Sequence, residues 1–123
     1  MIKIKRVYEA NASSDGARFF VERLWPRGIK KEKLLMQAWL KDVSPSPELR
    51  QWFQHDPEKW DIFQYRYREE LESNPQSWKP ILDALQTGDV TLLYSTRDTE
   101  KNSAYLLKVF LEEWLEKHAN PGD

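Results

Sequence analysis

The chain has 123 residues, of which 40% are hydrophobic and 32% charged, and its 19 basic and 20 acidic side chains give a formal net charge of −1. This length and composition predict one folded, soluble domain over residues 1–123 rather than a disordered segment. A net charge near zero supplies no overall field to hold the protein on nucleic acid or on an anionic membrane. The absence of cysteine excludes disulfides, thiolate catalysis and cysteine-ligated metals.

Apolar runs of targeting or membrane-spanning length are missing from the sequence. The first residues, Met1 to Arg6, alternate apolar and basic side chains, which is unlike the apolar stretch of a signal peptide. No later run approaches the length needed to span a bilayer. We therefore expect a cytoplasmic protein with no membrane partner.

The first part of the chain predicts two strands. Ile2, Ile4 and Val7 alternate roughly with basic residues, which favours a strand up to about Glu9. Residues 11–16 are rich in turn formers and predict an exposed loop. The run 19–21 (Phe-Phe-Val) then predicts a second strand.

The middle of the chain is less regular in its pattern. The charge run Lys30 to Lys33 predicts one solvated helical turn. The segment Leu34 to Val43 fits both a helix and a strand. We expect a short helix followed by a strand that ends near Lys41 and Asp42.

Three helix starts share the same chemistry, a capping side chain followed by proline. They are Ser46-Pro47, Asp56-Pro57 and Asn74-Pro75. Pro80 interrupts the third segment, so its firm helix is expected from about Ser77 to Gln86, and Gly88 closes it.

The segment 90–94 is apolar except for Thr91, as a strand buried on both faces requires. The loop Ser95 to Thr99 offers capping groups for a following amphipathic helix, and residues 118–123 are expected to form a frayed tail. The order of elements predicts an α/β fold, a single small domain with a mainly parallel sheet and helices on both faces. In such sheets ligands bind at the carboxyl ends of the strands.

The loop after the second predicted strand is the first candidate site. Pro26 and Gly28 make it stiff and sharply turned, and it presents Arg23 and Arg27 around Trp25. Guanidinium groups match phosphate or carboxylate, and an indole can stack on a ring. In the structural alternative, both arginines pair with acids such as Glu22 and Asp42 while Trp25 fills the core.

The loop after the last strand is the second candidate. Ser95, Arg97 and Asp98 would lie at a helix N-terminus, where free N–H groups and the helix dipole attract an anion. In the alternative, these residues form an ordinary N-cap. Tyr94, at the strand end, either donates its hydroxyl to a ligand or packs in the core.

Secondary candidates are Lys41, Asp42 and His55. Lys41 and Asp42 follow a predicted strand and could reach the same crevice, although a salt-bridged edge is the simpler account. His55 is suggested only by the ordinary pKa range of histidine, and a structural or surface role is favoured for it. The two histidines lack metal-ligand spacing, so no metal site or cofactor is predicted. No serine or cysteine motif marks a covalent nucleophile.

Together these motifs resemble the short, YeaO-like branch of the domain-of-unknown-function family 488. The resemblance covers nearly the whole chain and is carried by strings that include Arg23-Leu24-Trp25-Pro26-Arg27-Gly28, Trp39-Leu40-Lys41-Asp42, His55-Asp56-Pro57 and Thr91-Leu92-Leu93-Tyr94. It implies a bacterial, cytoplasmic α/β domain and no particular reaction. Longer members have a cysteine-containing motif after the last strand, where this chain has Tyr94-Ser95-Thr96, so thiol chemistry would not transfer. Some relatives carry a transcription-regulator label, but this sequence shows no helix-turn-helix with a basic recognition helix.

Three functional hypotheses follow. The first is a protein that binds, or acts on, a small anionic or nucleotide-like ligand in a crevice at the strand carboxyl ends. The second is a nucleic-acid-binding or transcription-regulatory module that uses a local patch of Arg23, Arg27 and the lysines of the 30–33 run. The third is a protein-interaction module with an aromatic surface. The net charge disfavours nucleic acid as a partner. The sequence leaves the ligand, any reaction and the oligomeric state open.

Overall fold

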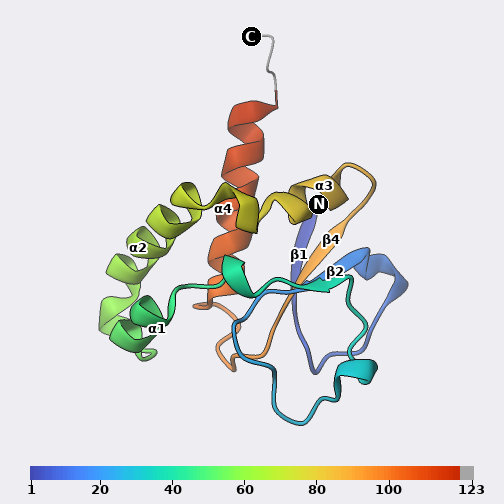
Figure 1. Cartoon of the computed structure of the whole chain (residues 1–123), viewed down its shortest axis with the longest axis horizontal. Coiled ribbons are helices and arrows are strands. Elements are labelled where there is room, and N and C mark those ends of the chain that lie inside the picture. The colour runs from blue at the N-terminus through green and yellow to red at the C-terminus, as the bar shows by residue number, and fades with distance from the viewer. Residues whose placement is uncertain (120–123) are drawn as a thin grey trace.

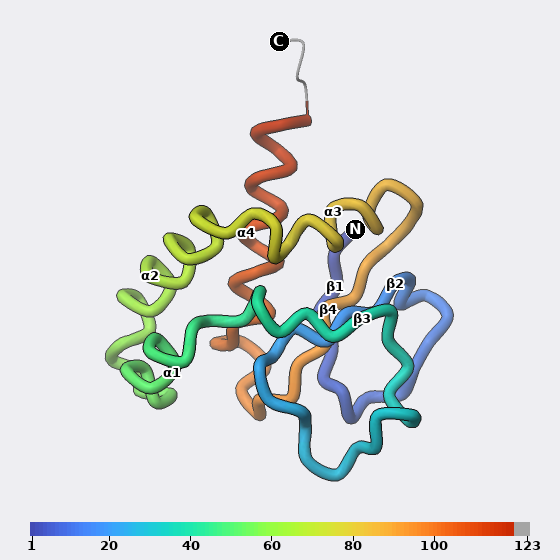
Figure 2. Tube along the Cα trace, in the orientation of Figure 1, coloured from blue at the N-terminus to red at the C-terminus, as the bar shows by residue number. Residues whose placement is uncertain are grey.

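The structure, a computed structural model, describes residues 1–119 and contains one sheet of parallel strands in the order β1-β4-β2-β3 (Figures 1 and 2). The strands are β1 (Ile2–Arg6), β2 (Ala17–Phe20), β3 (Ala38–Trp39) and β4 (Val90–Tyr94). The α-helices are α1 (Pro47–Phe53), α2 (Trp60–Ser73), α3 (Lys79–Leu85) and α4 (Ser103–His118). Short 3-10 turns are η1 (Ser13–Asp15), η2 (Lys31–Lys33), η3 (Lys41–Val43), η4 (Pro57–Lys59) and η5 (Pro75–Ser77). The predicted α/β class and parallel sheet are confirmed.

Strand β4 is the centre of the sheet, as its apolar sequence predicts. All five of its residues are buried, and it pairs with β1 on one side and β2 on the other. The polar exception, Thr91, is satisfied because its hydroxyl donates to the backbone oxygen of Asp15 at 2.7 Å. A strand in this position needs apolar side chains on both faces, which explains the continuous run.

One face of the sheet is covered by the α-helices. Phe19 and Leu92 of the sheet belong to the same buried cluster as side chains from every α-helix in the described residues. These helical side chains include Leu49 of α1, Phe63 of α2, Ile81 of α3 and Leu107 of α4. Burial of this apolar area is the main contribution to the stability of the fold.

The second face has a different cover. Phe20 and Leu93 point to this face, where Leu34 and the rings of Trp25 and Trp39 pack against them. Their cover comes from the connection between β2 and β3, which lies on the opposite side of the molecule from α2 in Figure 1. The helical cover expected on this face is limited to short 3-10 turns such as η2, because Pro26 and the turn at Gly28 (φ 78°) keep the connection irregular.

Two of the three predicted helix caps form as expected. The Ser46 hydroxyl accepts from the Leu49 amide at 3.1 Å, and the Asp56 carboxylate accepts from the Glu58 amide at 3.0 Å. Asn74 makes no side-chain cap, and the third start gives the turn η5 before α3.

Helix α4 begins later than expected. Its N-cap is Asn102, whose side-chain oxygen accepts from the Tyr105 amide at 2.8 Å, so the predicted cap within Ser95 to Thr99 is wrong. The Asp98 carboxylate instead accepts from the amides of Glu100 and Lys101, which forms a separate turn before the helix. The helix continues to His118, and residues 120–123 of the predicted tail lie outside the described residues.

Two other expected boundaries also differ. Strand β1 ends at Arg6 rather than Glu9, because the Glu9 carboxylate accepts from the Arg6 amide at 2.7 Å and turns the chain. The helical turn predicted for Lys30 to Lys33 forms as η2, but the short helix expected at the start of the segment Leu34 to Val43 is absent, and the strand there has only two residues and ends at Trp39. None of the helices in the described part of the chain combines the length and apolar character needed to cross a membrane.

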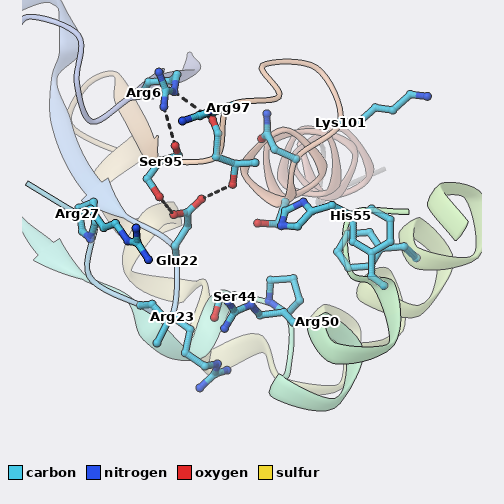
Figure 3. A pocket seen from close by; sticks show the side chains of 18 of the residues that line it. Arg6, Glu22, Arg23, Arg27, Ser44, Arg50, His55, Ser95, Arg97 and Lys101 are labelled. Atoms are coloured by element: carbon cyan, nitrogen blue, oxygen red, sulfur yellow. Dashed lines mark hydrogen bonds between the residues drawn. The ribbon is translucent and has the colours of Figure 1, made fainter. Parts of the chain in front are cut away.

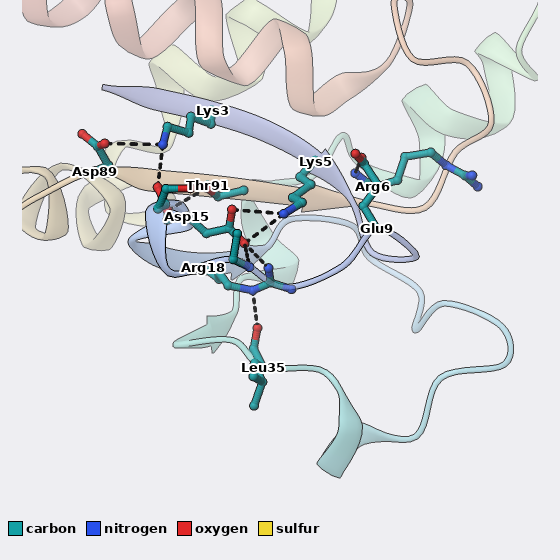
Figure 4. A network of polar contacts seen from close by, with 11 residues as sticks. Lys3, Lys5, Arg6, Glu9, Asp15, Arg18, Leu35, Asp89 and Thr91 are labelled. Atoms are coloured by element: carbon teal, nitrogen blue, oxygen red, sulfur yellow. Dashed lines mark hydrogen bonds and ion pairs between the residues drawn. The ribbon is translucent and has the colours of Figure 1, made fainter.

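A buried ionic network centred on Asp15 fastens the β1–β2 connection to the sheet (Figure 4). Asp15 is only 4% exposed, and its carboxylate accepts from Lys5 at 3.2 Å and from the guanidinium of Arg18. Arg18 also donates to the Leu35 backbone oxygen at 2.6 Å. Burial acts to raise the pKa of the Asp15 carboxyl, but the hydrogen bonds from the Ala12 amide, Lys5 and Arg18 outweigh it and hold the pKa below its usual value.

We expect Asp15→Ala to lower the free energy of unfolding by about 3 kcal/mol or more, because it leaves the buried Arg18 without its charge partner. Urea unfolding followed by circular dichroism measures the change. The matched control is Asp89→Ala, since Asp89 pairs with Lys3 and the N-terminus in an exposed position and should matter much less. An equal loss in both variants would contradict the assigned role of the buried network.

The same network predicts an acid dependence of stability. A carboxyl whose pKa is lowered by folding stabilises the native state above its unfolded pKa, and this contribution is lost as the pH falls through the folded pKa. The difference in stability between the wild type and Asp15→Asn should therefore shrink as the pH falls below the ordinary Asp value of 3.8. Unfolding curves at several pH values between neutrality and acid measure this difference.

Candidate functional site

The carboxyl ends of β1, β2 and β4 open into a cleft of about 680 Å³ (Figure 3). The register explains why these ends coincide, since Tyr94 pairs with Arg6 and Leu93 pairs with Phe20. Three connections that are distant in the sequence therefore leave the sheet at one level, with α1 and the start of α2 as the facing wall. This is the position at which parallel sheets bind ligands.

The Glu22 carboxylate joins two of the loops that form the cleft. It accepts from the Ser95 hydroxyl at 2.5 Å and from the Thr96 hydroxyl at 3.0 Å. On the other side of the same loop, the Arg6 guanidinium donates to the backbone oxygens of Ser95 and Thr96 at 2.8 and 3.1 Å. The loop after β4 is thus held by side chains that follow β2 and end β1 (Figure 3).

Cationic side chains surround the cleft. Its lining includes Arg6, Arg23, Arg27, Arg50, Arg97 and Lys101, with Glu22 as the only acidic lining residue within residues 1–119. None of these seven charged side chains takes part in an ion pair within 4.0 Å in residues 1–119. The Nε atom of Arg23 is buried without a hydrogen-bond partner, and its side chain extends away from Glu22 in Figure 3. The cleft therefore carries an excess of positive charge in a protein whose formal net charge is −1.

Aromatic side chains form the facing wall. Phe53 and Phe63 are stacked with ring centroids 4.2 Å apart, and Trp60 stacks on Phe63 at 5.7 Å. His55 lies 5.8 Å from Phe53 between ring centroids. The backbone of His55 has a φ of 56°, in the left-handed region that costs free energy for a residue with a side chain.

Most of the residues predicted as a site line this cleft. Arg23, Trp25, Arg27, Ser95 and Arg97 come together there, with the secondary candidate His55 on the opposite wall. Whether they bind a ligand stays a prediction.

Trp25 lines the cleft and also packs against the core, as the structural alternative for this residue predicted. Its indole N–H donates to the Ile29 backbone oxygen at 2.5 Å, and its ring packs edge-on against Phe20 and Trp39. By contrast, the alternative in which Arg23 and Arg27 pair with local acids finds no ion pair in residues 1–119.

Four predicted residues lie outside the main cleft. Tyr94 is 3% exposed and packs in the core, where burial raises the pKa of its hydroxyl. Lys41 instead stacks its ammonium 4.1 Å from the Trp39 ring centre, and Asp42 lines a separate hollow. Asp98 lines a recess that adjoins the cleft, where the amides of Lys101 and Glu100 lower the pKa of its carboxyl.

Sequence reasoning missed several lining residues. Arg6 is the last residue of β1 and Glu22 lies two residues after β2, so the strand-end rule used for the later loops could have found both. Arg50 and Lys101 carry no such signal, because one lies within α1 and the other in the turn before α4. Within residues 1–119, no group of three His, Asp or Glu side chains is placed to hold a metal ion.

We expect Glu22 and Ser95 to be energetically coupled, because they share a short charge-assisted hydrogen bond. A double-mutant cycle of Glu22→Gln and Ser95→Ala, read by urea unfolding, should give a coupling energy of about 1 kcal/mol or more. The control cycle pairs Glu22→Gln with Thr87→Ala, whose hydroxyl bonds locally to Ala84. That cycle should be additive within about 0.5 kcal/mol. Equal coupling in the two cycles would exclude a specific link between the loops.

Comparison with known proteins places the chain in a family. It is 40% identical over 114 residues to "Uncharacterized protein YeaO" of Escherichia coli (strain K12), which covers 93% of this chain and 96% of that protein. It is 47% identical over 73 residues to "Uncharacterized protein Rv3073c" of Mycobacterium tuberculosis (strain ATCC 25618 / H37Rv), covering 59% of this chain and 62% of that protein. No solved structure matches. Residues 1–123 match the family described as "Inactive DUF488-N3 subclade". The chain therefore belongs to the DUF488 family, with YeaO as a relative over nearly its whole length.

Proposed function

We propose that the cleft at the strand carboxyl ends binds a small anionic ligand, such as a molecule that carries phosphate. The observation that carries the proposal is the charge of the lining. Within residues 1–119, six cationic residues line the cleft with a single carboxylate, and that carboxylate is already hydrogen-bonded to Ser95 and Thr96. Of the six, Arg6 is itself hydrogen-bonded to the backbone oxygens of Ser95 and Thr96.

An anion would relieve the mutual repulsion of these cations. Like charges held around one concave surface destabilise each other, and a partly enclosed site screens them less than open solvent does. Guanidinium groups also form planar, bidentate contacts with phosphate or carboxylate. Arg27 and Arg97 are exposed at the cleft, so their guanidinium groups are accessible to such a ligand.

Binding is favoured over catalysis. The hydroxyls of Ser95 and Thr96 are engaged with Glu22, and the family to which the chain belongs is described as inactive. The chain also has no cysteine. We propose that it is a ligand-binding protein of the cytoplasm, a reducing compartment in which proteins are stable without disulfides.

A nucleic-acid partner fits the lining less well. The cations come from several separate loops and surround a concavity, whereas a protein that reads DNA commonly inserts a helix into the major groove. The cleft is of the size typical of small-molecule sites.

Replacing Arg27 by alanine should weaken binding of pyrophosphate to the full chain by about tenfold or more, because one charge-assisted contact is lost. The fold should be retained, since the Arg27 side chain is exposed and the contact that fixes this residue is a hydrogen bond from the Tyr8 hydroxyl to its backbone oxygen. Isothermal titration calorimetry measures the affinity.

The matched control for Arg27→Ala is Lys79→Ala, which removes the same charge from an exposed position on α3 outside the cleft. Its affinity for pyrophosphate should be that of the wild type. The proposal fails if the wild type does not bind pyrophosphate, or if both variants lose affinity equally.

For duplex DNA we expect only weak binding that falls steeply as salt concentration rises. Fluorescence anisotropy of a labelled duplex, measured at low and physiological ionic strength, checks this expectation. A tight, sequence-selective complex at physiological salt would favour the regulatory alternative instead.

A further inference from the structure

We infer that the anionic ligand is a nucleotide, whose base lies in the aromatic recess beside the cleft while its phosphate lies among the cations. This inference rests on the proposed function and adds the chemistry of the rest of the ligand. It depends on the shape of the recess, on the three aromatic rings at its wall and on one carboxylate.

The recess continues the cleft. It has a volume of about 480 Å³, and all of its lining residues except Pro57 and Asp98 also line the cleft. Arg97 and Lys101 border both spaces, where Asp98 in the recess offsets part of their charge, whereas Arg6 and Arg27 line only the cleft. A ligand that spans the two spaces would therefore place its anionic part toward Arg27 and a neutral part toward the recess.

Aromatic faces make the recess suitable for a flat ring. Phe53, His55 and Trp60 all border it, and the ring centroids of His55 and Trp60 lie 5.8 and 5.9 Å from that of Phe53. Stacking on aromatic side chains is a general means of holding nucleobases. His55 is exposed, so its ring does not pack in the core and is accessible to a ligand.

The backbone at this wall is held in an unfavourable conformation. Gln54 and His55 are the only residues other than glycine with positive φ within residues 1–119, at 47° and 56°. Gln54 is the left-handed C-cap of α1, a common way for a helix to end, whereas His55 extends the left-handed conformation by one more residue, which costs free energy. Here the second of them carries the imidazole into the lining of the recess.

Asp98 gives the recess a hydrogen-bonding preference. Its Oδ1 atom accepts from two backbone amides, while Oδ2 makes no hydrogen bond within residues 1–119. The carboxylate is therefore an acceptor at the edge of a flat site. It can accept a hydrogen bond from a ring amino group, which adenine, guanine and cytosine carry, whereas a phenyl ring offers it no donor.

The test compares ligands that share the anion and differ in the ring. Calorimetry on the full chain uses pyrophosphate, ribose 5-phosphate, phenyl phosphate, AMP, GMP, CMP and UMP. At least one of AMP, GMP and CMP should bind about tenfold or more tightly than ribose 5-phosphate and phenyl phosphate, because stacking adds to the phosphate contact. Asp98→Asn should reduce the preference for that nucleotide over UMP.

The decisive variant is His55→Asn, which removes the ring and keeps a residue that tolerates positive φ. It should bring the affinity for the nucleotide close to that for ribose 5-phosphate, and it should lower the affinity for pyrophosphate much less. The matched control is Gln54→Asn, a change at the neighbouring positive φ that does not line the recess. Thermal unfolding of both variants checks that they fold.

The outcomes separate the two proposals. Equal affinities for nucleotides and ribose 5-phosphate, with pyrophosphate binding retained, would overturn the nucleotide inference and leave the anion site standing. Phenyl phosphate binding as tightly as the nucleotides would point to a phosphotyrosine side chain instead, and would also overturn it. If neither pyrophosphate nor any nucleotide binds, both proposals fail.

Discussion

Parallel pairing of a fully buried strand with both of its neighbours is the constraint on which this structure depends. The apolar side chains of β4 can be removed from water only if each face of the sheet is covered, by α-helices on one side and by the β2–β3 connection on the other. The same pairing aligns the ends of β1, β2 and β4, because all of them run in one direction. Burial of one hydrophobic strand thus brings Arg6, Glu22 and Ser95 to a common level, although these residues are far apart in the chain.

Within residues 1–119, charged side chains are paired in the network around Asp15 but not in the cleft. In the network around Asp15, each buried charge has an opposite partner, which is the condition under which an ionic group can be buried without a large loss of stability. In the cleft, cations outnumber acids and Arg23 leaves a buried Nε unsatisfied. The first arrangement serves the fold, since its hydrogen-bonding capacity is used internally. The second leaves hydrogen-bond donors and positive charges without partners in the described part of the protein, which distinguishes the cleft from the Asp15 network.

Sequence patterns were sufficient for the elements whose causes are local. The span of β4, the caps at Ser46 and Asp56 and the parallel sheet follow from hydrophobicity and capping chemistry. A strand was expected in the segment of β3, but its two-residue length and its end at Trp39 could not be predicted, because its pairing with β2 depends on a tertiary contact rather than on its own propensity. The cap of α4 was misassigned because Ser95 and Thr96 are engaged by Glu22, a partner that is distant in sequence. For the same reason, the rule that ligands bind at strand ends identified two loops of the cleft, but no local feature of the sequence indicates that Arg50 would face these loops.

The order of the strands also determines which backbone groups remain available at the borders of the sheet. The borders are β1 and β3, while the most hydrophobic strand lies between partners on both sides. The border at β3 is only two residues long, and β1 carries Lys3 and Lys5 at alternate positions. Short or lysine-bearing border strands are poor templates for an additional chain. This arrangement protects a tryptophan-rich, nearly neutral protein from edge-to-edge aggregation while the opening at the strand ends stays accessible.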